Sequence, residues 1–297
     1  MKSALIILPI LSGVMWGAAG VFVRTLTDYG MDSVTVVFSR VSLATLMMLA
    51  LILLADRGWL RFDRRDLWIF VACALAMLGL NAFYTYSVDV VTLSLAAVLL
   101  SLSPVFMLAM TAVIFRERVT IRKLACMVTS IIGCILVSGI ADGGSSVSES
   151  GVAAGLAAAF FYALYGILSK KSASRGYSTY TTLFYCLLIS TLVLLPFSDL
   201  GTFAGFAAEG AYEAGYLVLQ AAVASFLPYI LYTTAMARME GGTASILAAA
   251  GEPTAAAVFG AMIFAETPTP LMLLGMLLAI GSMAAMCMPS QNDSATS

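Results

Sequence analysis

The chain has 297 residues, of which 61% are hydrophobic and only 10% are charged, with a mean hydropathy of +1.00 and no histidine. Soluble domains carry about 25% charged residues, so this composition excludes a water-soluble globular protein. The balance of 15 basic and 16 acidic residues argues against nucleic acid as a partner, and the lack of histidine excludes catalysis by imidazole.

Apolar runs between charged or turn-forming clusters predict ten membrane-spanning helices, since one span takes about 20 residues. The sequence therefore predicts an all-α polytopic membrane protein with short connections. The predicted helices cover residues 4–23, 34–55, 67–87, 93–115 and 121–140 in the first half, and residues 152–169, 179–196, 215–235, 243–265 and 270–288 in the second.

The charged residues between these helices predict the orientation of the chain. All of the lysines and arginines except Arg24 and Arg40 lie in the connections on the N-terminal side, and the opposite connections are acidic. Basic connections face the cytoplasm, so both termini are predicted to be cytoplasmic. We expect a multi-pass protein of the cytoplasmic (inner) membrane of a bacterium.

The five cysteines fall in apolar runs without C-x-x-C spacing. They are expected to be buried small side chains rather than disulfide or zinc ligands. We therefore predict no metal site and no cofactor.

The two halves of the chain repeat one pattern. Pro104 and Glu117 correspond to Pro253 and Glu266, with the proline thirteen residues before the glutamate in each half. A unit of five spans is odd, so the second unit is predicted to be inverted, an arrangement typical of transporters. Further matches join Trp16-Gly17 to Tyr162-Ala163, Tyr84-Thr85 to Tyr232-Thr233, and Arg24 to Lys170.

This repetition predicts the domain organisation. We expect a first five-helix repeat over residues 1–141, an external linker over 142–150, a second five-helix repeat over 151–289 and a disordered cytoplasmic tail over 290–297.

Together these features resemble the EamA family of the drug/metabolite transporter (DMT) superfamily over about residues 4–288. The resemblance rests on ten helices in two repeats, Trp16-Gly17 in the first helix, Arg40 in the second, the repeated proline-to-glutamate spacing, and the Glu252-Pro253 pair in the ninth helix. It implies secondary transport of small metabolites, often amino acids.

Glu252 is the one acidic residue well inside a predicted span. A charge at that depth costs about 2.5–3.5 kcal/mol on insertion scales, so we expect it to carry a coupling proton or to pair with a substrate amine. The alternative is a structural carboxylate that satisfies freed backbone amides. Proline lacks a backbone donor, so helix breaks are predicted at Pro104 and Pro253, and Ser103 takes the place of Glu252 in the first repeat.

Arg40 is the second charge within a predicted span. It could extend toward the outer interface, which arginine can reach, or it could pair with a substrate carboxylate or a helix end.

Aromatic and amide side chains are expected to line the substrate cavity, although each could instead serve packing. Asn81 is the most informative, because a primary amide in an apolar span needs a partner. The residues are Trp16, Asn81, Tyr84, Tyr162, Tyr165, Tyr229 and Tyr232.

The predicted function is a proton-linked or facilitative secondary transporter, acting as an exporter of small polar metabolites such as amino acids, by alternating access around a midplane site. No G-x-x-x-x-G-K-[ST] loop is present to hold ATP, so a primary pump is not expected. The alternatives are a channel or uncoupled facilitator, a membrane enzyme, and a scaffold. The expected partners are the small-molecule substrate, protons and lipid, and Gly13-x-x-x-Gly17 favours helix packing within a monomer over a dimer.

Overall fold

The structure is a computed structural model that describes residues 2–90, 99–117, 119–137, 148–264 and 269–287, and every regular element in these residues is a helix. Six helical segments are long and apolar enough to cross a membrane by length and composition. They are Leu5–Asp28, Ser33–Ala55, Arg64–Ser87, Glu149–Ser174, Thr179–Phe197 and Ala211–Arg238.

The helices of the first half follow the predicted apolar runs. The side chain of Asp32 accepts a hydrogen bond from the backbone amide of Thr35 at 2.7 Å and so fixes the start of the second helix. The elements are α1 (Lys2–Asp28), α2 (Ser33–Ala55), α3 (Leu67–Val90), α5 (Ser103–Ile114) and α6 (Ile121–Val137), with short 3-10 turns at Arg57–Leu60 and Arg64–Asp66.

The predicted fourth helix is described only from residue 99 onward. A turn at Ser101 and Leu102 interrupts it, and α5 then begins with Pro104 in its first turn. Proline suits this position because the first backbone amides of a helix have no partner within the helix.

The second half also follows the predicted runs, with one additional helix. Residues 142–147 of the predicted linker and the predicted tail lie outside the described residues. The elements are α7 (Glu149–Ser174), α8 (Thr179–Leu194), α9 (Leu200–Glu209), α10 (Ala211–Ala221), α11 (Leu227–Arg238), α12 (Gly241–Phe264) and α13 (Pro270–Cys287), with a 3-10 turn at Leu195–Phe197.

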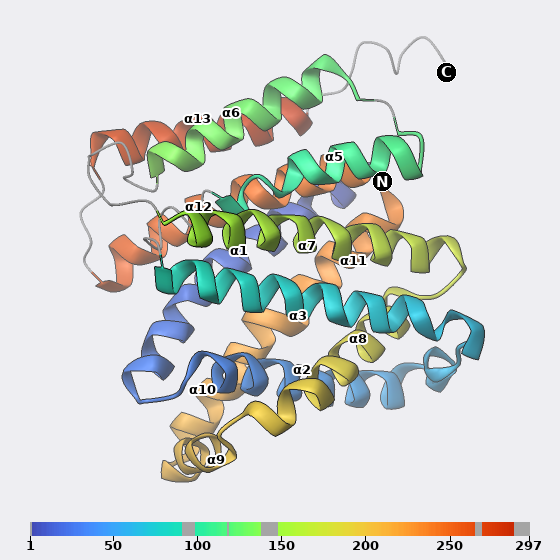
Figure 1. The fold of residues 1–297 in the computed structure, drawn as a ribbon, viewed down its shortest axis with the longest axis vertical. Coiled ribbons are helices and arrows are strands. Elements are labelled where there is room, and N and C mark those ends of the chain that lie inside the picture. The colour runs from blue at the N-terminus through green and yellow to red at the C-terminus, as the bar shows by residue number, and fades with distance from the viewer. Residues whose placement is uncertain (1, 91–98, 118, 138–147, 265–268, 288–297) are drawn as a thin grey trace.

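α9 is the helix that the apolar pattern does not predict. It begins where Asp199 accepts hydrogen bonds from the backbone amides of Gly201 and Thr202. At its other end, Glu209 accepts a hydrogen bond from the Tyr29 hydroxyl, which raises the pKa of that hydroxyl. α9 is therefore a short helix tied to the end of α1 at the periphery of the bundle (Figure 1).

The prolines of the second half have different effects. A π-helical turn spans Ala222–Phe226 just before Pro228, which has no N–H to donate to the carbonyl four residues earlier. By contrast, the predicted break at Pro253 is not seen, because α12 continues as an α-helix from Gly241 to Phe264. Proline removes only one backbone hydrogen bond there, and extensive packing of α12 along α1 supports the helix.

The helices of the two halves interlock. The most extensive contacts pair α3 with α7, α1 with α12, and α6 with α13, so each joins the first half to the second. α1 also contacts α11, and α2 contacts α8. Figure 1 shows α6 and α13 side by side at the top of the molecule and α2 toward its lower part. The largest buried cluster draws on α2, α3, α7, α8 and α11, so the main core lies where the halves meet.

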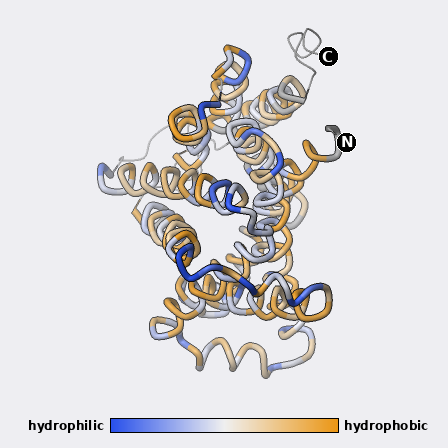
Figure 2. Tube along the Cα trace, turned by 90° about the vertical axis from the view of Figure 1, so that its right-hand side faces the viewer, coloured by the Kyte–Doolittle hydropathy of each residue, from blue (hydrophilic) through white to orange (hydrophobic). Residues whose placement is uncertain are grey.

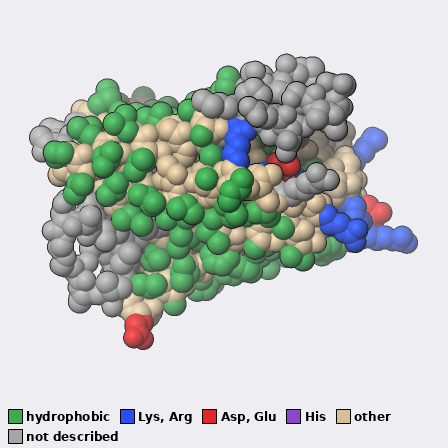
Figure 3. All heavy atoms as spheres, turned by 90° about the horizontal axis from the view of Figure 1, so that it is seen from above, with side chains coloured by type: hydrophobic (Ala, Val, Ile, Leu, Met, Phe, Trp, Pro, Cys, Tyr) green, Lys and Arg blue, Asp and Glu red, His purple; other side chains and the backbone are tan. Residues whose placement is uncertain are grey.

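Charged residues gather in the connections. Figure 2 shows mainly hydrophobic helices with hydrophilic stretches in the loops between them. In Figure 3 hydrophobic side chains cover much of the visible face, and lysine and arginine side chains project from its right-hand end. We call this the basic end; it is formed by residues 56–66, 115–117, 170–178 and 238–241.

Gly13 allows the backbones of α1 and α12 to touch. A Cβ atom at Gly13 would lie 2.2 Å from the carbonyl oxygen of Ala248. On the facing helix, a Cβ atom at Gly251 would lie 3.2 Å from the carbonyl oxygen of Ile10. Gly13 therefore serves close packing of α1 against α12 within the chain.

We expect Gly13→Ala to lower the free energy of unfolding by about 1–3 kcal/mol, because overpacking would force α1 and α12 apart. Unfolding in mixed micelles, followed by circular dichroism, measures this change. Gly281→Ala is the matched control, since a Cβ atom on α13 at that position meets open space. Equal stability of the two variants would contradict the role of Gly13.

Candidate functional site

Four aromatic side chains from both halves form a cluster at the centre of the bundle. The ring of Trp16 on α1 lies 5.7 Å from Tyr162 on α7, and 5.2 Å and 5.4 Å from Tyr229 and Tyr232 on α11, measured between ring centroids. The first two contacts are edge-to-face, an arrangement that aromatic rings favour. We call these four residues the aromatic cluster.

Tyrosine hydroxyls bring polar groups into this cluster. Tyr165 packs 5.4 Å from Tyr229, and its hydroxyl hydrogen bonds with Thr233 at 2.9 Å. The hydroxyl of Tyr162 is buried and has no hydrogen-bond partner among the described residues. A buried polar atom without a partner is costly, so this hydroxyl is available to a bound polar molecule.

Arg40 extends toward α3 inside the bundle. Its Nη2 atom donates a hydrogen bond to the Oδ1 atom of Asn81, whose Nδ2 atom donates to the carbonyl oxygen of Met77 at 2.7 Å. The amide of Asn81 thus has the partner that the sequence leads one to expect. The Nε atom of Arg40 is buried and has no hydrogen-bond partner in the described part of the chain. This guanidinium therefore retains a donor for an additional acceptor.

Glu252 approaches the same cluster from α12. Its carboxylate interacts electrostatically with the hydroxyls of Tyr84, Tyr162 and Tyr229. Arg40 also interacts with Tyr229, but the described side chains of Arg40 and Glu252 form no ion pair with each other. The structure thus places a guanidinium and a carboxyl group near one tyrosine without a direct contact between them.

Ser103 and Pro104 are both buried at the start of α5. The hydroxyl of Ser103 has no hydrogen-bond partner among the described residues. α5 packs against α7 and α12, which carry Tyr162 and Glu252. No described hydrogen bond joins Ser103 to the aromatic cluster, so it is placed near these helices but not within the cluster.

Gln220 is a buried polar residue that the sequence analysis does not single out. It is fully buried on α10, and its Oε1 atom accepts a hydrogen bond from the Ser39 hydroxyl at 3.3 Å. Ser39 is the residue before Arg40 on α2. Its Nε2 atom has no partner in the described residues. An amide within an apolar run, the signal that identifies Asn81, could have identified Gln220 as well.

In the described residues, no three His, Cys, Asp or Glu side chains are grouped so that they could hold a metal ion. The groups at this site are suited to binding a small molecule. They are a guanidinium, a carboxylate, tyrosine hydroxyls and aromatic faces. A mostly apolar environment with a few polar groups is typical of small-molecule sites.

An all-helical bundle of long apolar helices with charged side chains inside it defines a multi-pass membrane protein. The model of the EamA-like transporter family matches residues 3–139 and residues 149–288, and the chain belongs to this family.

Proteins similar in sequence to this chain include transporters. An uncharacterized transporter of Archaeoglobus fulgidus is 29% identical over 91% of this chain and 92% of its own length. The threonine/homoserine exporter RhtA of Escherichia coli is 28% identical over 84% of this chain and 79% of its own length. A solved crystal structure has the same fold, with a TM-score of 0.80, 15% identity and coverage of 96% of both chains.

We expect Asn81→Leu to lower the free energy of unfolding by about 1–3 kcal/mol, because it removes the acceptor of a largely enclosed guanidinium. Asn81→Asp should keep stability close to that of the parent protein, since a carboxylate also accepts from Arg40. Thermal unfolding in detergent measures both variants. If Asn81→Leu unfolded at the same temperature as the parent protein, the contact between Arg40 and Asn81 would not contribute to stability.

Proposed function

We propose that the protein is a secondary transporter, proton-linked or facilitative, that exports small polar metabolites such as amino acids. The observation that carries this proposal is the placement of Arg40 and Glu252 beside one aromatic cluster where the two halves meet. Membership of a transporter family and similarity to an exporter of threonine and homoserine support it.

We propose the topology of ten spans in two inverted repeats, with both termini in the cytoplasm of a bacterium and the protein in its inner membrane. The separate family match in each half supports the repeat. The packing supports a two-fold relation between the repeats, because the contact of α3 with α7 has a counterpart in the contact of α11 with α1. In the repeat, α1 is equivalent to α7, and α3 is equivalent to α11. The inversion follows from the odd number of proposed spans in each repeat. The basic end would then face the cytoplasm.

The proposed site would bind both charged groups of a zwitterionic substrate such as an amino acid. A substrate carboxylate would accept a hydrogen bond from Arg40, and a substrate amine would bind the carboxylate of Glu252. The rings of Trp16 and Tyr229 would pack against the carbon skeleton, and the Tyr162 hydroxyl would bond to a polar group.

The proposed coupling residue is Glu252. A carboxylate enclosed among helices favours its neutral form, so binding a proton and binding a cationic amine would be competing events at the same oxygen atoms. Such competition lets a proton from the outside displace the substrate amine and complete an export cycle. A channel would need no such exchange.

We expect Glu252→Gln to abolish the effect of a pH gradient on substrate flux, because glutamine neither binds nor releases a proton. Flux of labelled amino acids in proteoliposomes, with and without an imposed gradient, measures this effect. Glu149→Gln is the control, since Glu149 is exposed at the start of α7. Gradient-driven flux that persists in Glu252→Gln would refute the coupling role.

Arg40→Leu is expected to reduce export of amino acids at least tenfold at normal membrane abundance, because the substrate carboxylate loses its cationic partner. Arg40→Lys should retain part of the activity by keeping the charge without the forked geometry. Export by cells that express each variant, normalised to protein amount, measures the effect. Full activity of Arg40→Leu would dismiss Arg40 as a substrate-binding residue.

A further inference from the structure

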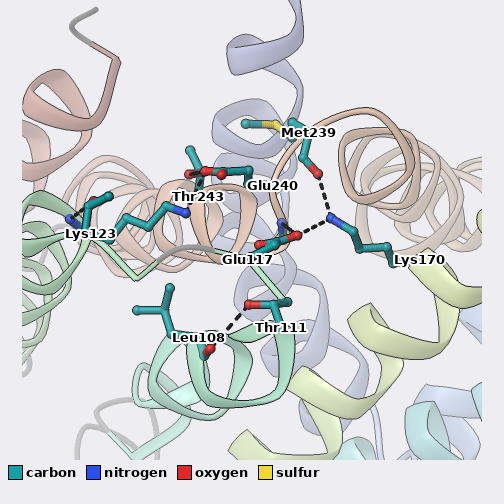
Figure 4. Close-up of polar contacts among 10 residues, drawn as sticks. Leu108, Thr111, Glu117, Lys123, Lys170, Met239, Glu240 and Thr243 are labelled. Carbon is teal, nitrogen blue, oxygen red and sulfur yellow. Dashed lines mark hydrogen bonds and ion pairs between the residues drawn. The ribbon is translucent and has the colours of Figure 1, made fainter. Parts of the chain in front are cut away.

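The basic end carries a shielded ion pair between the two halves. Lys170 in the last turns of α7 pairs with the Oε1 atom of Glu117, which follows α5 (Figure 4). Only 18% of the Lys170 side chain and 11% of the Glu117 side chain are exposed. This pair is therefore more than a surface contact, since low exposure strengthens the attraction between charges.

Both partners also hold the turn between α11 and α12. The Nζ atom of Lys170 donates a hydrogen bond to the carbonyl oxygen of Met239 at 3.1 Å, and the backbone amide of Gly241 donates to the Oε1 atom of Glu117 at 3.3 Å. We call Glu117, Lys170, Met239 and Gly241 the inner latch. It joins the end of α5, the end of α7 and the turn that opens α12.

A second ion pair secures the same turn. Lys123 near the start of α6 lies 2.6 Å from a carboxylate oxygen of Glu240, and the Lys123 side chain is only 6% exposed (Figure 4). Glu117 and Lys123 of the first half thus hold residues 239–241 of the second half from two sides.

The backbone after α5 directs Glu117 into the latch. Arg116 has a φ of 54°, a left-handed conformation that residues other than glycine rarely adopt. The amides of Phe115 and Glu117 both donate to the carbonyl oxygen of Thr111, which reverses the chain. The second carboxylate oxygen of Glu117 is buried and has no partner among the described residues. The latch is thus held by a strained turn and leaves one acceptor unsatisfied, so it is poised to open.

The latch lies at the basic end, beyond the aromatic cluster along α7 and α11. Lys170 follows Tyr162 by eight residues on α7, and Met239 follows Tyr232 by seven residues, just past the end of α11, so the latch is about 10–12 Å farther along these helices. Two fully buried methionines lie close beneath it: a Cβ atom at Gly166 would meet the terminal methyl groups of Met107 and Met236 at 2.4 Å and 3.1 Å. Unbranched methionine side chains repack easily, which suits a layer that must part.

We propose that the inner latch is the gate on the basic side of the transport pathway, closed in this structure and broken when that side opens. The proposal rests on the proposed transport function, and the contacts of Glu117 with Lys170 and with Gly241 join one half to the other. Rocking of the halves would separate Glu117 from Lys170 and Gly241, release the turn at residues 239–241 and expose the methionine layer.

The test uses accessibility of a reporter cysteine beneath the latch. The variant Met236→Cys is treated in inside-out membrane vesicles with a membrane-impermeant maleimide, and mass spectrometry measures the rate of labelling at residue 236. Adding Lys170→Met should raise that rate at least tenfold, because it removes the ion pair and the bond to Met239. Glu117→Gln should raise it less, since its amide oxygen can still accept from Gly241, and Lys170→Arg should leave it near the parent rate.

Arg175→Gln is the matched control, because the Arg175–Asp66 ion pair also joins the two halves at this end but involves neither Glu117 nor the turn at residues 239–241. It should leave labelling unchanged. Labelling within twofold of the parent in both Lys170→Met and Glu117→Gln would overturn the gate, and Glu117→Gln alone decides the matter if Lys170→Met does not fold. Labelling needs no substrate, so an intact latch effect without metabolite flux would count against the proposed function instead.

Discussion

A charge or an unpaired polar group inside a hydrophobic bundle is expensive, and this constraint governs where the few charged residues of the chain lie. Most lie in connections, where they cost little. Arg40 and Glu252 lie within helices, and each is placed beside groups that ease the cost. Arg40 has the Asn81 amide, and Glu252 has tyrosine hydroxyls near it. Neither partner is an opposite charge, so both residues keep the capacity to bind one.

Because the two halves interlock, the aromatic cluster contains residues from both of them. Each face of the aromatic cluster belongs to a different half, with Trp16 from α1 and the tyrosines from α7 and α11. A rotation of one half against the other would therefore change the site and the ends of the bundle together. In such a rotation the backbone contact of Gly13 with Ala248 would be kept, and the ion pairs at the basic end would break.

The sequence was sufficient to predict the features that depend on composition and length. Helix positions followed from apolar runs, because a span must bury about 20 residues. The buried partner of Asn81 was expected, since an amide in an apolar span cannot remain unpaired. The residues Trp16, Tyr162, Tyr229 and Tyr232 were expected at one site, and the structure brings their rings together.

Other features depend on three-dimensional context. α9 is short and is stabilised by the Asp199 cap, a local signal that hydropathy does not detect. Pro253 does not interrupt α12, because neighbouring helices decide whether a proline breaks a helix in a packed bundle. The pairing of Glu117 with Lys170 joins residues from different halves, so only the packing reveals it. The correspondence of these residues with Glu266 and Arg24 in the repeat gave no indication that they meet.

Solute counterflow tests the central claim most directly. Proteoliposomes loaded with an excess of unlabelled threonine, homoserine or another amino acid are diluted into a trace of the labelled compound. A carrier that exposes one site alternately to the two sides accumulates label transiently above equilibrium, and we expect this overshoot for at least one amino acid. Equilibration without an overshoot would indicate a channel, and no movement of any amino acid in the panel would contradict the proposed function.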